Sequence, residues 1–226
     1  MDTPTNRIEL EDIVLDYADI EEARRMSGLR LILGAYTIPG PWRESGKGLF
    51  YVKGLAYTPV RTANRSRSED EFGFDSAASV LEEWTGQASA PVAVWNDERP
   101  CYSWIDQIYL ADRLNPDPPL LPENLNDRAR MIGLIHLICG QQGLGWNCRH
   151  LIVKGALAEL TPDNPWYARL KFIGEKYSYS TAVGDTAPQR IAEILNVLNA
   201  QLESQRQAGS KYFFGKRLSA LDIFWA

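Results

Sequence analysis

The chain has 226 residues, 45% of them hydrophobic, which is enough for one large domain or two small ones with a buried core. Its formal net charge of −5 resides in residues 1–27, which hold eight acidic and three basic side chains, so the remainder offers no basic stripe for nucleic acid. No apolar run approaches the ~20 residues that span a bilayer, and the acidic N-terminus is unlike a signal peptide. The three cysteines and two histidines lack the spacing of metal ligands, which argues against a metal site. We expect a cytoplasmic protein that binds neither nucleic acid, membrane nor metal.

The acidic residues 1–28 form an extension in front of the first predicted strand. Within it, Asp19 stands where a helix N-cap would, and Glu22 follows three residues later. This spacing predicts a short helix at 19–26. Such a helix would either pack on the neighbouring sheet or cover the surface of a partner.

Short strand-like and helix-like segments alternate between residues 29 and 115. Apolar runs predict strands at 29–33, 56–61 and 92–95, and a fourth strand is expected at 100–103 after a turn. Helices are predicted at 42–53, which Gly54 would end, and at 104–114. The resulting order is βαβ, a middle segment, and then ββα.

The proline-rich stretch 116–124 predicts an extended linker, because proline restricts itself and its predecessor to extended conformations. Residues 125–226 are helical in pattern, with an apolar helix at 126–141 and an amphipathic helix at 188–207 that has Pro188 near its start. Ser219 and Asp222 have capping-box spacing and predict another helix start. Because this strong start signal is followed by the end of the chain, we expect the helical domain to continue beyond Ala226.

Pro91 directly precedes the apolar run 92–95, and a proline at this position has two interpretations. On base rates it marks the start of a strand, since only about 5–6% of X-Pro bonds are cis. The alternative is a cis-proline, with the backbone of the preceding Ala90 offered to a ligand.

These motifs, in this order, resemble the glutathione S-transferase family over about residues 29–226. The resemblance is carried by "SAPVAV" around Pro91, "SWIDQIYLADRLNP" at the end of the first half, "GLGWNCRHLI", and "LSALDIFWA" at the C-terminus. It implies an α/β plus all-α fold, in which a thioredoxin-like βαβ-ββα domain at 29–115 precedes a helical-bundle domain at 125–226. It also implies that Pro91 is the family's cis-proline and that Ala90 binds an extended peptide through its backbone.

The resemblance implies that a side chain after the first strand stabilises the glutathione thiolate. The family's serine or cysteine position falls near Gly40, which has no side chain, and its tyrosine position falls near Tyr36, with Thr37 beside it. We expect Tyr36 to donate to the thiolate. The alternatives are that Tyr36 is a packed aromatic residue, or that backbone amides at the start of the helix at 42–53 do this work.

The family holds the γ-glutamyl end of glutathione with an acidic residue or glutamine followed by serine, and here these positions read Tyr102-Ser103. Ser103 would bind the carboxylate or, equally, act only as an N-cap, while the missing acid puts ordinary glutathione affinity in question. Trp42 and Trp104 would line the ligand cleft or pack in the core. Arg149, with Trp166 or Tyr167, would line a second-substrate pocket.

We therefore expect a glutathione transferase or lyase that uses glutathione as co-substrate, without a metal, against a small hydrophobic electrophile. The family pattern implies a homodimer. The alternative is a non-catalytic ligand-binding or structural protein on the same fold, which Gly40 and Tyr102 favour. A thiol-disulfide oxidoreductase would need a low-pKa cysteine after the first strand, and none is present between residues 37 and 42.

Overall fold

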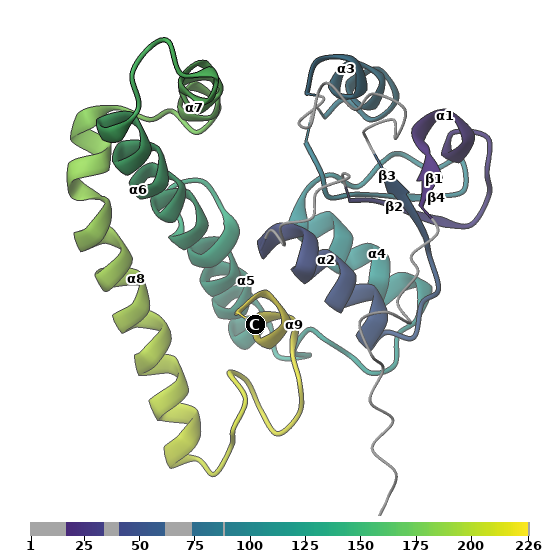
Figure 1. Ribbon diagram of the computed structural model, residues 1–226. Helices are drawn as coiled ribbons and strands as arrows, with labels where there is room; N and C mark the ends of the chain where they lie inside the picture. The colour runs from purple at the N-terminus through teal and green to yellow at the C-terminus, as the bar shows by residue number, and fades with distance from the viewer. Residues whose placement is uncertain (1–16, 34–40, 62–73, 88, 226) are drawn as a thin grey trace, which may run out of the picture. The chain divides into compact units, whose positions relative to one another are not determined.

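The computed structural model describes residues 17–33, 41–61, 74–87 and 89–225 (Figure 1). These residues pack into two units. The sheet unit is drawn from Met1–Pro39 and Leu55–Gln107, and the helical unit from Gly40–Gly54 and Ile108–Ala226. A mixed sheet with helices in one unit and helices alone in the other confirm the predicted α/β plus all-α fold class.

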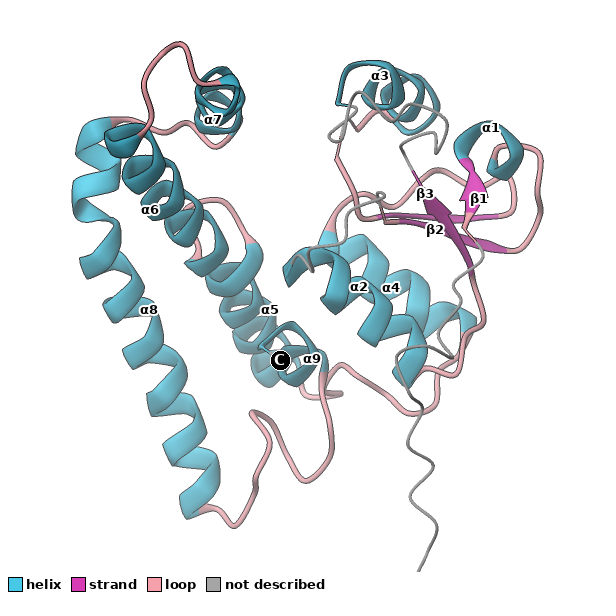
Figure 2. Cartoon of the chain, viewed as in Figure 1, coloured by secondary structure: helices cyan, strands magenta, loops and turns pink. Residues whose placement is uncertain are grey.

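A mixed sheet in the order β1-β3-β2-β4 forms the first unit (Figure 2). Its strands are β1 (Ala18–Asp19), β2 (Leu29–Ile32), β3 (Thr58–Arg61) and β4 (Val92–Trp95). The central strand β2 runs parallel to β3 and antiparallel to β4, where Ile32 lies opposite Val92. Every residue of β2 is buried, including Arg30, which fits the position of this strand between two others.

The expected fourth strand at 100–103 is wrong in extent. Only Cys101 pairs with β4, through a bridge to Ala93 in which the two N–H···O=C distances are 2.9 and 2.7 Å. Pro100 has no N–H to give to a ladder, and Ser103 already caps the next helix. One residue is therefore left to pair.

The acidic extension contributes β1 and the short helix α1 (Ile20–Ala23) to the sheet unit. Ala18 pairs in parallel with Val60 of β3, and Ile20 and Ala23 are buried in the core. Asp19 precedes α1 with extended backbone, but its side chain makes no capping hydrogen bond, so the predicted side-chain cap is wrong. The carboxylate instead binds Arg61 Nε on β3 at 2.7 Å.

The core of this unit lies between the sheet and α1 together with α3 (Phe74–Thr85). Buried Arg30 of β2 donates to Met26 O and, at 2.6 Å, to Asn96 O, and its guanidinium lies over the Trp84 ring of α3. Burial lowers the pKa of Arg30, an effect that the nearby Asp97 opposes. The guanidinium thus joins the ends of β2 and β4 to the α3 side of the core.

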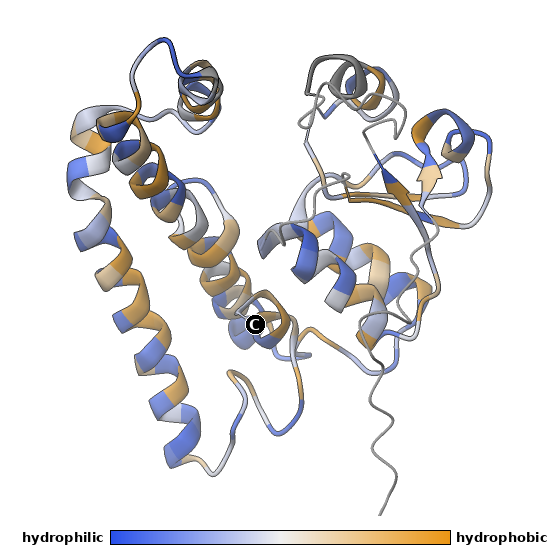
Figure 3. Cartoon of the chain, viewed as in Figure 1, coloured by the Kyte–Doolittle hydropathy of each residue, from blue (hydrophilic) through white to orange (hydrophobic). Residues whose placement is uncertain are grey.

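The first residues of helix α4 (Trp104–Leu114) belong to the sheet unit, and those from Ile108 on belong to the helical unit. The other helices of the helical unit are α2 (Pro41–Val52), α5 (Leu125–Cys139), α6 (Leu144–Glu159), α7 (Pro165–Lys176), α8 (Thr181–Gln207) and α9 (Ala220–Trp225). Helix α6 packs against α7 and α8, and α9 packs against α2 and α5. Along α8, apolar and polar residues alternate in the helical period (Figure 3), and Ile194 and Leu198 of the apolar face are buried.

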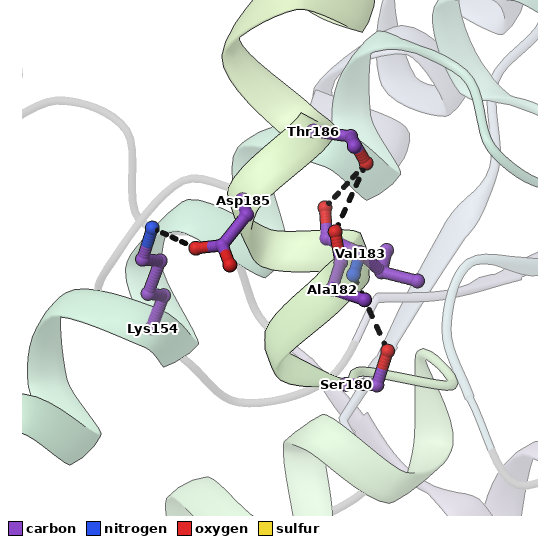
Figure 4. A network of polar contacts seen from close by, with 6 residues as sticks. All are labelled: Lys154, Ser180, Ala182, Val183, Asp185 and Thr186. Carbon is purple, nitrogen blue, oxygen red and sulfur yellow. Dashed lines mark hydrogen bonds and ion pairs between the residues drawn. The ribbon is translucent and has the colours of Figure 1, made fainter.

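Helix α8 begins seven residues before Pro188, so the expected start near that proline is wrong. Ser180 is the N-cap, and its hydroxyl accepts a hydrogen bond from Val183 N at 3.3 Å (Figure 4). An ion pair of 2.6 Å between Lys154 of α6 and Asp185 holds the first turns. Pro188 therefore lies inside the helix, where it leaves one carbonyl of the preceding turn without its amide partner.

In the capping box before α9, the Asp222 carboxylate accepts three hydrogen bonds from described residues. Asp222 Oδ2 accepts from Ser219 N at 2.8 Å and from Ser219 Oγ at 2.6 Å, while Asp222 Oδ1 accepts from Phe213 N at 3.0 Å. The reach of Asp222 back to Ser219 is confirmed. The serine hydroxyl donates to the carboxylate, in place of accepting from the Asp222 backbone.

A buried ion pair joins α2 to α4 within the helical unit. Lys53 follows α2, its side chain is fully buried, and its ammonium contacts the Asp112 carboxylate and donates to Pro118 O at 2.7 Å. Asn115 Nδ2 donates to Lys53 O at 2.7 Å. The predicted linker is thereby tied to two helices of the same unit.

Candidate functional site

An open peptide unit precedes β4 in the sheet unit. The Ala90–Pro91 bond is cis, and Ala90 packs, partly buried, against the sheet core. Within the described residues, neither the N–H nor the C=O of Ala90 makes a hydrogen bond. Because backbone polar groups near a core normally find partners, this unit can receive an extended ligand that pairs as a strand does.

Gln107 on α4 holds this segment in place. Its side chain is buried, and Nε2 donates to Pro91 O and to Cys101 O, each at 3.1 Å. One amide group therefore joins the residue after Ala90 to the residue that bridges β4. This role of Gln107 could not be predicted from the sequence, because a glutamine in an amphipathic helix carries no signal of contacts 16 and 6 residues away.

The N-terminus of α4 lies next along the chain. Ser103 Oγ accepts a hydrogen bond from Asp106 N at 3.3 Å, which confirms its N-cap role. The hydroxyl is half-buried and retains its own proton, and the positive end of an 11-residue helix lies behind it. These features suit a carboxylate, although the binding of one at Ser103 stays a prediction.

Tyr102 and Trp104 flank this serine. Tyr102 is exposed, with 40% of its surface accessible, and Trp104 is half-buried at the first position of α4. The first turn of α4 contains one acidic residue, Asp106, which is exposed. A ligand ammonium at Tyr102 would meet a phenol in place of a carboxylate.

The expected thiolate donors Tyr36 and Thr37, together with Gly40, lie outside the described residues. Their roles stay predictions.

Trp42 packs inside the helical unit. Its indole N–H donates to Cys139 O at 2.9 Å, and its ring lies 6.2 Å from that of Tyr177. Helix α6 comes so close to the ring that a Cβ on Gly145 would fall 2.8 Å from it. These contacts give Trp42 a packing role within its unit, and its role as a cleft wall stays a prediction.

Tyr177 lies among aromatic and cationic side chains of the helical unit. Trp146 meets its ring edge-on at 5.0 Å, and the Arg149 guanidinium lies 5.9 Å from its centre. Arg149 therefore contacts Tyr177, and its role beside Trp166 or Tyr167 in a second-substrate pocket stays a prediction. Burial first, and the charge of Arg149 second, lower the pKa of Lys176 next to Tyr177.

Of the two histidines, the buried His150 positions the end of α7. Its Nε2 lies 2.8 Å from Tyr177 O, so this nitrogen carries the proton and donates. Its Nδ1 is buried too and has no hydrogen-bond partner among the described residues. His136 is exposed on α5.

The cysteines of the helical unit show no activation. Burial raises the pKa of the Cys139 thiol well above its ordinary value and raises that of Cys148. Within the described ranges, no three His, Cys, Asp or Glu side chains gather as metal ligands. No helix in the same ranges is long and apolar enough to cross a membrane.

No protein-family model and no curated protein matches the sequence. Solved structures do match. A glutathione S-transferase of Methylobacterium radiotolerans in complex with glutathione sulfonate is 17% identical with a TM-score of 0.58, and covers 88% of this chain and 76% of its own. The chain has the glutathione S-transferase fold.

Further structures show how widely this fold match extends. A Tau class glutathione S-transferase from mango is 20% identical with a TM-score of 0.52, covering 88% of this chain and 72% of its own. Ure2p in complex with glutathione is 10% identical with a TM-score of 0.55, covering 88% of this chain and 81% of its own. At these identities the match establishes the fold, and chemistry has to be argued from the residues.

Proposed function

We propose that this protein binds glutathione along the backbone of Ala90 and at the N-terminus of α4. The observation that carries the proposal is that the N–H and C=O of Ala90 have no hydrogen-bond partner among the described residues, in a segment that Gln107 holds beside the serine cap of α4. The cysteinyl residue of glutathione would pair with Ala90 as an added strand does. Its γ-glutamyl carboxylate would bind the Ser103 hydroxyl and the amides of the first helical turn.

The bound tripeptide would react through its sulfur. A thiol with an ordinary pKa near ~8.5 is a weak nucleophile at neutral pH, and a hydrogen bond from the Tyr36 hydroxyl or Thr37 would favour its thiolate. The thiolate attacks the electrophilic carbon of a small hydrophobic substrate. A carbon–sulfur bond forms, and the leaving group departs with the electron pair of the broken bond.

A second candidate function is glutathione or peptide binding without catalysis. Tyr102 favours it, because the position that the family resemblance assigns to an acidic residue holds an exposed phenol. The two functions differ in turnover. Conjugation of 1-chloro-2,4-dinitrobenzene that follows the enzyme concentration supports the transferase, and binding without conjugation supports the second function.

Calorimetric titration with glutathione tests the site itself. Ser103→Ala should weaken binding about tenfold, as expected for a lost hydrogen bond to a charged group. The matched control is Ser180→Ala, which removes an equivalent N-cap bond, also 3.3 Å long, from α8. The absence of heat at millimolar glutathione, or equal effects of both substitutions, would contradict the proposal.

A further inference from the structure

A cavity of about 770 Å³ opens in the helical unit, and none of the residues that line it belongs to the proposed glutathione site. Four segments line it: the linker 119–123, the first turns of α5, the last turns of α8 and the loop 214–219 before α9. Its volume lies within the range of small-molecule sites in proteins. No role is given to it by the proposed reaction.

The cavity has an apolar floor. Leu120 and Leu121 of the linker, Met131 of α5 and Phe214 of the loop all line it, and each is at most 8% exposed. Because they come from three different segments, the floor is part of the packed core of the unit. An apolar ligand body would find a preformed surface here.

A polar acceptor stands in this floor. Gln201 of α8 is 4% exposed and lines the cavity, and its Nε2 donates to Phe213 O at 2.6 Å. That bond sets the orientation of the side-chain amide, since a backbone carbonyl can only accept. Gln201 Oε1 accepts no hydrogen bond from any described residue, which leaves it to a donor on a ligand.

The rim carries more positive than negative charge. Arg130, Lys216 and Arg217 line the cavity together with Glu123 and Asp127. None of these three cations makes an ion pair with a described residue, whereas Lys154 and Arg206 elsewhere in the unit do. In a chain with a net charge of −5, this excess of cations favours an anionic group at the rim.

We propose that the cavity binds a small amphipathic carboxylate that also carries an amide N–H, the chemistry of an N-acylated amino acid. The acyl chain lies on the apolar floor, the N–H donates to Gln201 Oε1, and the carboxylate meets Arg130, Lys216 and Arg217. All of these residues belong to the helical unit, so the proposal does not depend on glutathione binding.

Titration calorimetry at low salt with N-decanoylglycine tests the site. N-decanoylsarcosine differs only by an N-methyl group that removes the donor, and it should bind about fivefold more weakly, the effect of one neutral hydrogen bond. N-decanoylglycinamide, which lacks the charge, should also bind more weakly. Raising the salt concentration should weaken N-decanoylglycine because rim charges are screened.

The protein variants separate the cavity from general surface charge. Lys216→Gln with Arg217→Gln removes two cations that form no ion pair with a described residue, and should weaken the binding of N-decanoylglycine about tenfold. Lys211→Gln with Arg206→Gln changes the net charge equally outside the cavity and should leave binding unchanged. No saturable binding, equal affinity for the glycine and sarcosine ligands, or equal loss in both double variants would overturn the proposal.

Discussion

Gln107 donates through a single amide nitrogen to the carbonyl oxygen of Pro91, 3.1 Å away, and the same nitrogen reaches Cys101 O at an equal distance. The glutamine is 1% exposed, so both carbonyls are satisfied inside the protein. It is a positioning residue for the peptide unit that the proposed function places under glutathione.

Replacing Gln107 by leucine should lower the free energy of unfolding by about 1–3 kcal/mol, because Pro91 O loses its side-chain donor and Cys101 O keeps only the bond from Ala93 N. Urea denaturation measures this loss. Gln189→Leu is the control, since that glutamine is exposed on α8 and bonds to Glu193 at the surface. Equal stability of the two variants would show that the Gln107 bonds are dispensable.

Tyr102→Asp should strengthen glutathione binding. The substitution places a carboxylate where the family resemblance expects one for the ligand ammonium, and a charge-assisted hydrogen bond of about 1.5 kcal/mol corresponds to roughly tenfold in affinity. Tyr109→Asp adds the same charge at another exposed tyrosine, further along α4. A gain with both substitutions, or with neither, would argue against an ammonium subsite at residue 102.

Tyr36→Phe removes the expected donor to the glutathione sulfur. The thiolate absorbance of bound glutathione at pH 7 and the rate of conjugation should both fall, while the affinity for S-methylglutathione, which has no thiol proton, should stay the same. Thr37→Val is the companion variant. If only Thr37→Val lowers the thiolate signal, the threonine is the donor, and if neither does, both assignments are wrong.

Lys53→Met should destabilise the protein by about 3 kcal/mol, because Asp112 would lose a cation and Pro118 O its donor inside the helical unit. Thermal or urea unfolding gives the measurement. Lys47→Met breaks the partly exposed pair with Glu44 on α2 and should cost less than about 0.5 kcal/mol. Similar losses in both variants would mean that the buried Lys53–Asp112 pair contributes no more to the free energy of unfolding than the partly exposed Lys47–Glu44 pair.

The thiols of Cys139 and Cys148 should react slowly with iodoacetamide at pH 7, since burial raises the pKa of both and the thiolate is the reactive form. The rate at Cys148, the exposed one of the two, should rise about tenfold per pH unit up to its pKa. Because the pKa of such a thiol is higher in the folded than in the unfolded protein, its contribution to the free energy of unfolding is fully present at a pH below the unfolded-state pKa of ~8.5. This contribution is lost as the pH rises above that value. Fast alkylation of either cysteine at pH 7, read by peptide mass spectrometry, would contradict this.

Local signals in the sequence predicted much of the fold. The strand at 92–95 and the helix at 104–114 agree with β4 and α4, because Pro91 and Ser103 mark their starts within the segment itself. The start of α8 was missed for the converse reason. Pro188 is a strong local signal, but Ser180 caps the helix earlier, and the Lys154–Asp185 pair supports the first turns from another helix.

The candidate site was predictable only in part. Ala90, Pro91 and Ser103 follow from short motifs, whereas Gln107 acts through contacts with segments far from it in sequence. The cavity near Gln201 is similar, since its walls come from four separate stretches of chain. A periodic pattern tells which face of a helix is apolar, but it does not tell which distant carbonyl a buried amide will meet.

The pairing of β1 with β3 has a consequence for handling the protein. Without Ala18 and Asp19, the outer side of β3 would present unpaired amide and carbonyl groups, a template on which further chains can stack and aggregate. Residues 18–23, with the Asp19–Arg61 ion pair, shield that border. An expression variant shortened to begin after residue 24 should therefore precipitate more readily, whatever its ligand affinity.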